Sequence, residues 1–164
     1  MTRSLGASLP PALVERFSQR DLDRRLGLAL PFVTVDRDGR PHPMLLSYLE
    51  LRAYDAGTLG VVIGARSRSA TNLVERGKAT LLVVEPDATV YVKLAAVDGP
   101  LPVAAADELG YFLLAVEEVL EDAAADWEGG MRITDAIRYE PSPRLDEIWA
   151  RATLAALAEP RARA

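Results

Sequence analysis

The stretch VVIGARSRS at residues 61–69 carries the most information about the fold and about a binding site. It joins the end of an apolar strand, predicted over residues 58–64, to a short polar helix, predicted over residues 66–77. Serines stand at the start of this helix and Gly77 stands at its end, and both residue types are common caps. The stretch therefore predicts a strand, a tight connection and a capped helix.

The start of this predicted helix suits an anion. Free backbone N–H groups at a helix N-terminus attract negative charge, serine hydroxyls add donors, and the arginine fork matches phosphate oxygens. The candidate phosphate ligands are Arg66, Ser67, Arg68 and Ser69. The alternative is that a serine only caps the helix while both arginines stay in solvent.

Short predicted strands surround this stretch on both sides, which favours an antiparallel sheet or barrel over a βαβ sheet. Neither a G-x-G-x-x-G fingerprint nor a Walker loop is present, which disfavours a Rossmann fold and a P-loop. We therefore expect a mainly β fold of the α+β class. Strands are expected at residues 28–36, 44–52, 58–64, 78–85, 88–97 and 131–140, and helices at 8–17, 66–77, 104–125 and from Ser142 onward.

In the strand expected at 44–52, alternate residues from Leu45 to Leu51 form the apolar face, and Tyr48 faces outward. Ser47 lies on the apolar face, so it needs a hydrogen-bond partner from backbone, water or ligand if it is buried.

Two of the expected helices carry further predictions. Ser8 is expected to cap the first helix. The helix at 104–125 has an apolar stripe, and an acidic cluster crowds its later turns as either a solvated face or a cation site. The cluster consists of Glu117, Glu118, Glu121 and Asp122.

Composition excludes several classes of protein. The 164 residues suit one domain, expected over 1–164 with a core barrel at about 28–140 and flanking helices. Acidic residues (24) exceed Lys plus Arg (19), which argues against a nucleic-acid partner. There is no cysteine and one histidine, which argues against a metal site. With neither a signal peptide nor a membrane-length apolar run, we expect a cytoplasmic protein with no membrane partner.

The single histidine lies in a second informative stretch, GRPHPMLLS at residues 39–47. His42 is able to titrate or to hydrogen-bond a cofactor near neutral pH. The alternative is a half-exposed histidine between two prolines at the start of a strand.

Residues 31–97 resemble the FMN-binding split barrel, the fold of pyridoxamine 5'-phosphate oxidase and its relatives. The resemblance covers the order of elements: a strand entering DGRPHP at 38–43, two more strands, SRSATNL at 67–73, and a strand after GKA at 77–79. It implies a homodimer with the flavin between the subunits.

Matched residue by residue, Ser67 and Arg68 agree with the Ser-Arg pair that holds the flavin phosphate in that family. Ser69 stands where the oxidases have lysine. In their Arg-x-x-Leu-Leu-Lys strand along the flavin, His42 replaces the arginine and Ser47 replaces the lysine, while the two leucines agree. The resemblance thus implies an FMN site that includes Ser67, Arg68, Ser69, Arg66, Ser47, His42 and Asn72.

Two hypotheses follow from this resemblance. The first is an FMN-dependent oxidoreductase of unknown substrate, with weaker flavin affinity than a family oxidase because two lysines are replaced by serines. Pyridoxamine phosphate oxidase activity itself is not expected, because no histidine follows His42. The second is a non-catalytic split-barrel dimer that binds a ligand weakly or not at all. A deazaflavin-dependent enzyme is a third reading that the sequence does not separate from the first.

Overall fold

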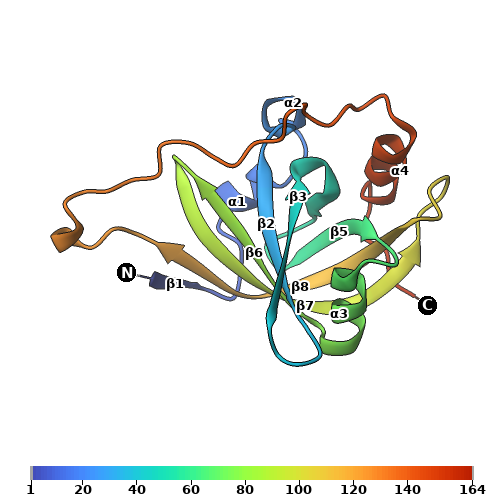
Figure 1. Cartoon of the computed structure of the whole chain (residues 1–164), viewed down its shortest axis with the longest axis horizontal. Coiled ribbons are helices and arrows are strands. Elements are labelled where there is room, and N and C mark those ends of the chain that lie inside the picture. The colour runs from blue at the N-terminus through green and yellow to red at the C-terminus, as the bar shows by residue number, and fades with distance from the viewer. Residues whose placement is uncertain (1, 164) are drawn as a thin grey trace.

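The computed structural model describes residues 2–163. Within this range eight strands form one antiparallel sheet in the order β3-β2-β6-β7-β8-β5-β4, and β1 pairs with β8. The sheet is curled, with short helices at its rims (Figure 1). Its buried side chains form an apolar core. The strands are β1 (Thr2–Gly6), β2 (Ala29–Val35), β3 (Pro41–Ser47), β4 (Leu51–Ala53), β5 (Thr58–Gly64), β6 (Lys78–Glu85), β7 (Ala88–Pro102) and β8 (Leu109–Asp122). The helices are α1 (Pro11–Arg16), α2 (Leu22–Arg25), α3 (Arg68–Arg76) and α4 (Ile148–Ala156), with 3-10 turns η1 (Tyr48–Glu50) and η2 (Asp126–Glu128). The mainly β class predicted from the sequence is confirmed.

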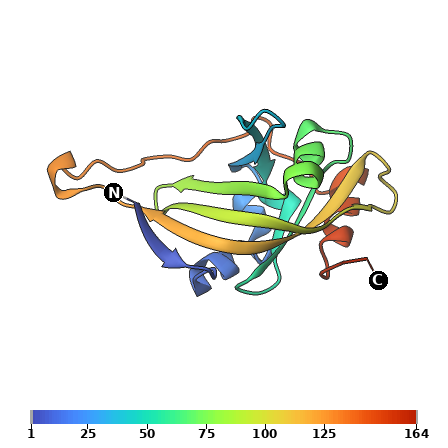
Figure 2. The same ribbon diagram turned by 90° about the horizontal axis from the view of Figure 1, so that it is seen from below.

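The three long strands β6, β7 and β8 form the middle of the sheet and curve along their length (Figure 2). In β6 and in the first half of β7, buried and more exposed residues alternate, so one face meets the core. The main core cluster joins inward side chains such as Phe32, Leu81, Val92 and Phe112 to residues of α1. A smaller cluster packs α4 against β5 and β8 through residues that include Val62, Tyr111 and Leu157.

The predicted strands at 58–64 and 78–85 are confirmed with the same bounds, as β5 and β6. The predicted helix at 66–77 is confirmed as α3 with Ser67 at its N-cap and Gly77 at its C-cap. The first predicted helix is confirmed as α1, but its N-cap is Pro10 without a side-chain bond, so Ser8 does not cap it. Strand β1 was not expected from the sequence.

The long helix predicted at 104–125 is wrong, because residues 109–122 form strand β8. The start of β8 lies between β5 and β7 and is buried on both faces, so its apolar residues follow one another without alternation. In the sequence, this unbroken apolar run is also compatible with the apolar stripe of a helix. The acidic cluster is correspondingly spread over a strand, where Glu117 pairs with Lys78, Glu118 with Lys93 and Glu121 with Arg3.

The last predicted strand and helix are also corrected. Residues 131–140 have no regular structure apart from one bridge between Leu28 and Arg138 and two backbone bonds to residues 27 and 29. The barrel therefore does not extend to residue 140, since its last strand ends at Asp122. The final helix α4 begins at Ile148, after Glu147, rather than at Ser142.

The strand predicted at 44–52 is interrupted. The turn η1 breaks it into β3 and β4, because the Glu50 carboxylate accepts hydrogen bonds from the backbone N–H and hydroxyl of Ser47. The interruption changes which side chains face the core: Tyr48 is buried, contrary to the prediction, and Leu45 is 45% exposed. Between residues 2 and 163, no helix is long and apolar enough to cross a membrane.

Candidate functional site

The N-terminus of α3 is built by local sequence. Strand β5 ends at Gly64, and the hydroxyl of Ser67 accepts a hydrogen bond from the backbone N–H of Ala70 at 3.1 Å. The helix ends where Gly77 adopts a positive φ of 65° and donates its N–H to the carbonyl of Leu73. The cap bond uses one of the four N–H groups that a helix start leaves without an intrahelical partner.

Two arginines flank this helix start and point outward. Arg66 is exposed, and no hydrogen bond or ion pair within residues 2–163 engages its guanidinium. The side chain of Arg68 is 67% exposed, and its Nη1 lies 3.9 Å from the carboxylate of Asp36. Both guanidiniums are therefore available to an anion that approaches the helix start.

A carboxylate lies beside these arginines. Asp36 follows β2, and its Oδ1 accepts a hydrogen bond from Nδ2 of Asn72 at 2.9 Å. The same oxygen lies 3.9 Å from Nη1 of Arg68 and 4.0 Å from Nδ1 of His42. The β2–β3 hairpin brings His42 here by pairing it with Thr34, and α3 packs on β2. The structure thus gathers His42, Arg68 and Asn72 around one acidic oxygen.

Ser69 and Asn72 are buried in the body of α3. The Nδ2 group of Asn72 donates to the hydroxyl of Thr34, also at 2.9 Å, as well as to Asp36. Asn72 therefore links α3 to β2, and Ser69 is the second residue of the helix, so its backbone N–H has no intrahelical partner.

Ser47 lies apart from this group. It pairs with Ala29 at the other end of the β2–β3 ladder, five residue steps, about 17 Å, along β3 from His42. Its backbone N–H and hydroxyl donate to the Glu50 carboxylate at 2.7 Å and 2.9 Å. Burial raises the pKa of Glu50, although the two bonds from Ser47 oppose the rise. The partner that a buried Ser47 needs is thus supplied by its own turn.

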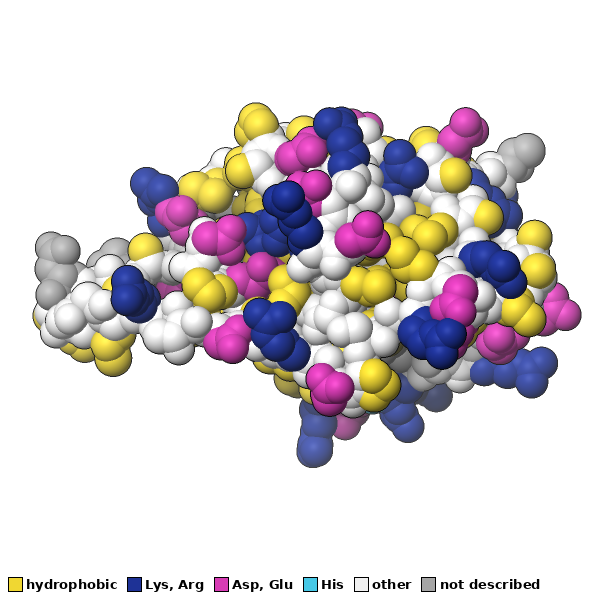
Figure 3. All heavy atoms as spheres, turned by 90° about the horizontal axis from the view of Figure 1, so that it is seen from above, with side chains coloured by type: hydrophobic (Ala, Val, Ile, Leu, Met, Phe, Trp, Pro, Cys, Tyr) yellow, Lys and Arg dark blue, Asp and Glu magenta, His cyan; other side chains and the backbone are white. Residues whose placement is uncertain are grey.

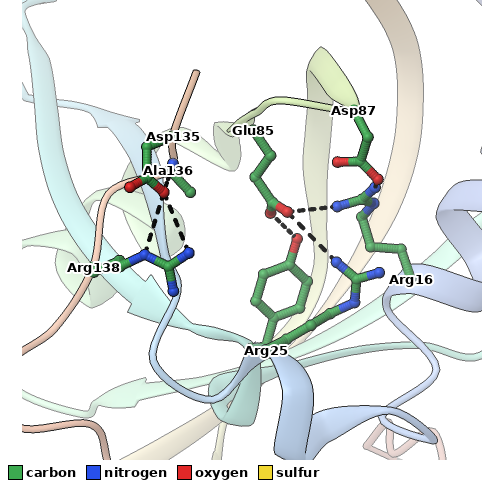
Figure 4. A network of polar contacts seen from close by, with 8 residues as sticks. Arg16, Arg25, Glu85, Asp87, Asp135, Ala136 and Arg138 are labelled. Atoms are coloured by element: carbon green, nitrogen blue, oxygen red, sulfur yellow. Dashed lines mark hydrogen bonds and ion pairs between the residues drawn. The ribbon is translucent and has the colours of Figure 1, made fainter. Parts of the chain in front are cut away.

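A second charged cluster was missed in the sequence. Glu85 ends β6, is buried, and accepts hydrogen bonds from the hydroxyl of Tyr48 and from Nη1 of Arg16 at 2.7 Å (Figure 4). Arg25 lies 3.5 Å from the same carboxylate and stacks over the Tyr48 ring, and Asp87 bonds the other end of Arg16 at 2.6 Å. Burial and the bond to Glu85 raise the pKa of Tyr48.

A signal for this cluster exists in the sequence. Ala79, Leu81, Val83 and Glu85 occupy alternate positions of β6 and share its buried face. A carboxylate at the end of such an apolar row predicts a buried ion pair. Asp36 carries no comparable signal, because it follows the strand in a polar hairpin.

Two larger cavities occur between residues 2 and 163. One, of about 780 Å³, lies at the Glu85 end and is lined by α1, the β6–β7 turn, the end of β8 and residues after it that include Met131 and Ile133. The other, of about 290 Å³, lies beside the β2–β3 hairpin and is lined by residues that include Val33, Pro41, Lys78 and Lys93. None of the residues predicted to bind the cofactor lines either cavity.

No family profile and no curated protein sequence matches the chain. In contrast, 62 chains of solved structures match it. A candidate pyridoxamine 5'-phosphate oxidase from Lactobacillus delbrueckii matches with a TM-score of 0.55 and 18% identity, over 71% of this chain and 98% of that chain. An FMN-binding protein from Syntrophomonas wolfei matches with a TM-score of 0.52 and 14% identity, over 70% and 91% of the two chains. These similarities confirm the split-barrel fold that the sequence predicted.

Proposed function

We propose that this chain binds FMN by its phosphate at the N-terminus of α3 and acts as a flavin-dependent oxidoreductase on a small molecule. One observation carries the proposal: two exposed arginines flank a capped helix start in a split barrel. Proteins with this fold include one described as FMN-binding, which supports the choice of ligand.

The donors at the start of α3 fit a phosphate group. Arg68 and Ser69 are the first two helical residues, so their backbone N–H groups have no intrahelical partner. The guanidiniums of Arg66 and Arg68 add charge-assisted donors on the solvent side. His42 lies 4.0 Å from Asp36 and is partly exposed, so we expect it to contact the ligand beside its phosphate. When bound, the flavin supplies the two-electron redox chemistry.

We expect the flavin ring to lie between two copies of the chain. The residues around the start of α3 lie outside both cavities, so a single copy offers the ring no enclosing wall. Hydrophobic side chains also reach the surface between charged ones (Figure 3). Leu45 of β3, 45% exposed, is one example. Light scattering at micromolar concentration should therefore report a homodimer, and a monomer would contradict this part of the proposal.

Flavin affinity should be lower than in a site with lysines at positions 47 and 69. Ser69 contributes a backbone donor instead of a charge, and Ser47 is engaged with Glu50. Neutral hydrogen bonds are about half as strong as charge-assisted ones. We expect a dissociation constant in the micromolar range and a protein that takes up flavin when it is added.

The test is a titration of the purified protein with FMN, followed by flavin fluorescence. Arg68→Ala should weaken binding by about 1.5–3 kcal/mol, the contribution of a hydrogen bond to a charged group. The matched control is Arg20→Ala, which removes the same charge from an exposed ion pair with Glu15 near α2. Equal affinities in the two variants would place the phosphate elsewhere.

The non-catalytic alternative has one observation in its favour, the carboxylate of Asp36 beside the proposed phosphate site. Under that alternative the start of α3 is only a structural cap. Absence of FMN binding at millimolar flavin would favour it over the oxidoreductase.

A further inference from the structure

Asp36 stands inside the proposed phosphate site and is held there. Its side chain is only 20% exposed, and the 2.9 Å hydrogen bond from Asn72 fixes its Oδ1. The main chain around it is also fixed, since its N–H donates to the carbonyl of Arg40 and its carbonyl accepts from Gly39. The carboxylate is therefore held in place through both its side chain and its main chain.

The position of Asp36 changes the charge that a ligand meets. Arg66 and Arg68 supply two positive charges, and Asp36 offsets one of them from 3.9 Å away. A phosphate that binds Arg68 must come close to this carboxylate, so the two anions repel each other. The repulsion grows with ligand charge, and a phosphomonoester carries nearly twice the charge of a phosphodiester near neutral pH.

We propose that Asp36 is a selectivity residue, which disfavours a dianionic phosphomonoester relative to a monoanionic phosphodiester at the start of α3. This inference rests on the proposed function, because it concerns the phosphate end of the same site. Asp36 acts in two ways: it competes with the ligand for the Arg68 guanidinium, and its fixed negative charge repels the phosphate.

The substitution Asp36→Asn isolates the charge. Asparagine keeps a carbonyl oxygen that accepts from Asn72, so the link between α3 and β2 is preserved. Asp38→Asn is the matched control, because it removes the same charge two residues away, from an exposed pair with Arg40 at 3.3 Å. Thermal unfolding verifies that both variants fold. Asp36→Ser, a shorter neutral residue, is the second variant for the case in which the amide perturbs the hairpin.

The experiment compares three flavins at pH 8: FMN, riboflavin 4',5'-cyclic phosphate as the diester of the same flavin, and riboflavin without phosphate. We expect Asp36→Asn to tighten FMN about tenfold more than the cyclic phosphate, as one removed charge at close range does near a protein surface. Asp38→Asn should leave the ratio of the two affinities at its wild-type value.

The outcomes separate this inference from the proposed function. If FMN binds in an Arg68-dependent way but the ratio is the same in Asp36→Asn and wild type, Asp36 is not a selectivity residue and the proposed function stands. If riboflavin binds as tightly as FMN, or no flavin binds, the phosphate site is misplaced and both proposals are overturned.

Discussion

Glu85 and Asp36 are two carboxylates at opposite ends of the same sheet, each beside arginines, and their surroundings differ. Glu85 is buried and receives Arg16, whose side chain is 8% exposed, together with Tyr48 and Arg25. Asp36 is partly exposed, and Arg68 stays 3.9 Å away with most of its side chain in solvent. The Glu85 carboxylate has its cationic partners within the chain, whereas the guanidiniums near Asp36 remain exposed to another molecule. We call the Glu85 cluster closed and the Asp36 cluster open.

A structural ion cluster and a binding site respond differently to the loss of one partner. Removing a partner from a closed cluster strands a buried charge and costs folding free energy. Removing a partner from an open one costs little stability and changes affinity instead. The Glu85 end should therefore respond in unfolding experiments and the α3 end in binding experiments.

The largest expected effect is that of Glu85→Ala. It removes the only ion-pair partner of Arg25 among residues 2–163 and leaves the buried Arg16 with Asp87 alone, so the free energy of unfolding in urea should fall by about 3–5 kcal/mol. The control is Glu15→Ala, which breaks an exposed pair with Arg20 at 3.1 Å and should cost less than about 1 kcal/mol. Similar losses in the two variants would show that the Glu85 cluster is not closed.

A smaller effect is expected for Tyr48→Phe, with a dependence on alkaline pH. Because the folded state raises the pKa of Tyr48, its contribution to stability is complete below pH 10 and is lost as the pH rises above 10. Wild-type stability should therefore fall with pH above 10 more steeply than that of Tyr48→Phe, by up to about 1.4 kcal/mol per pH unit. Tyr54 and Tyr91, whose pKa values are also raised, contribute equally to both proteins. Parallel pH profiles would mean that Tyr48 is not held by Glu85.

The smallest effect on stability should come from Asp36→Asn. The hydrogen bond from Asn72 has an acceptor in both proteins, and the lost contact with Arg68 is long and exposed. The free energy of unfolding should change by less than about 0.5 kcal/mol. A loss of unfolding free energy as large as that of Glu85→Ala would show that Asp36 is a structural residue. The two ends of the sheet would then not differ as proposed.

The sequence predicted the elements whose signals are local. Strands β5 and β6 and the caps of α3 followed from apolar runs, Ser67 and Gly77. It misassigned β8, because a strand buried on both faces loses the alternation that distinguishes it from a helix. It also missed η1, where the side chain of Glu50 turns back to Ser47 and ends the strand.

One part of the candidate site was likewise predictable from local sequence, and another part was not. Its helix start was predictable, because the cap bond joins Ser67 to Ala70 within one short stretch of sequence. The position of Asp36 was not, because it depends on how α3 docks against the β2–β3 hairpin through Asn72 and Thr34. The separation of Ser47 from His42 follows from their spacing along β3, but the engagement of Ser47 by Glu50 depends on the turn η1, which was not predicted from the sequence.

Binding of the FMN phosphate at the start of α3 is best tested through the backbone amide resonances of the ¹⁵N-labelled protein, followed during titrations with FMN and with riboflavin. We predict that the amides of Arg68 and Ser69 shift with FMN and stay in place with riboflavin, which lacks the phosphate. Phosphate-dependent shifts at residues lining the 780 Å³ cavity, such as Leu13 and Val90, with none at Arg68 and Ser69, would contradict the account.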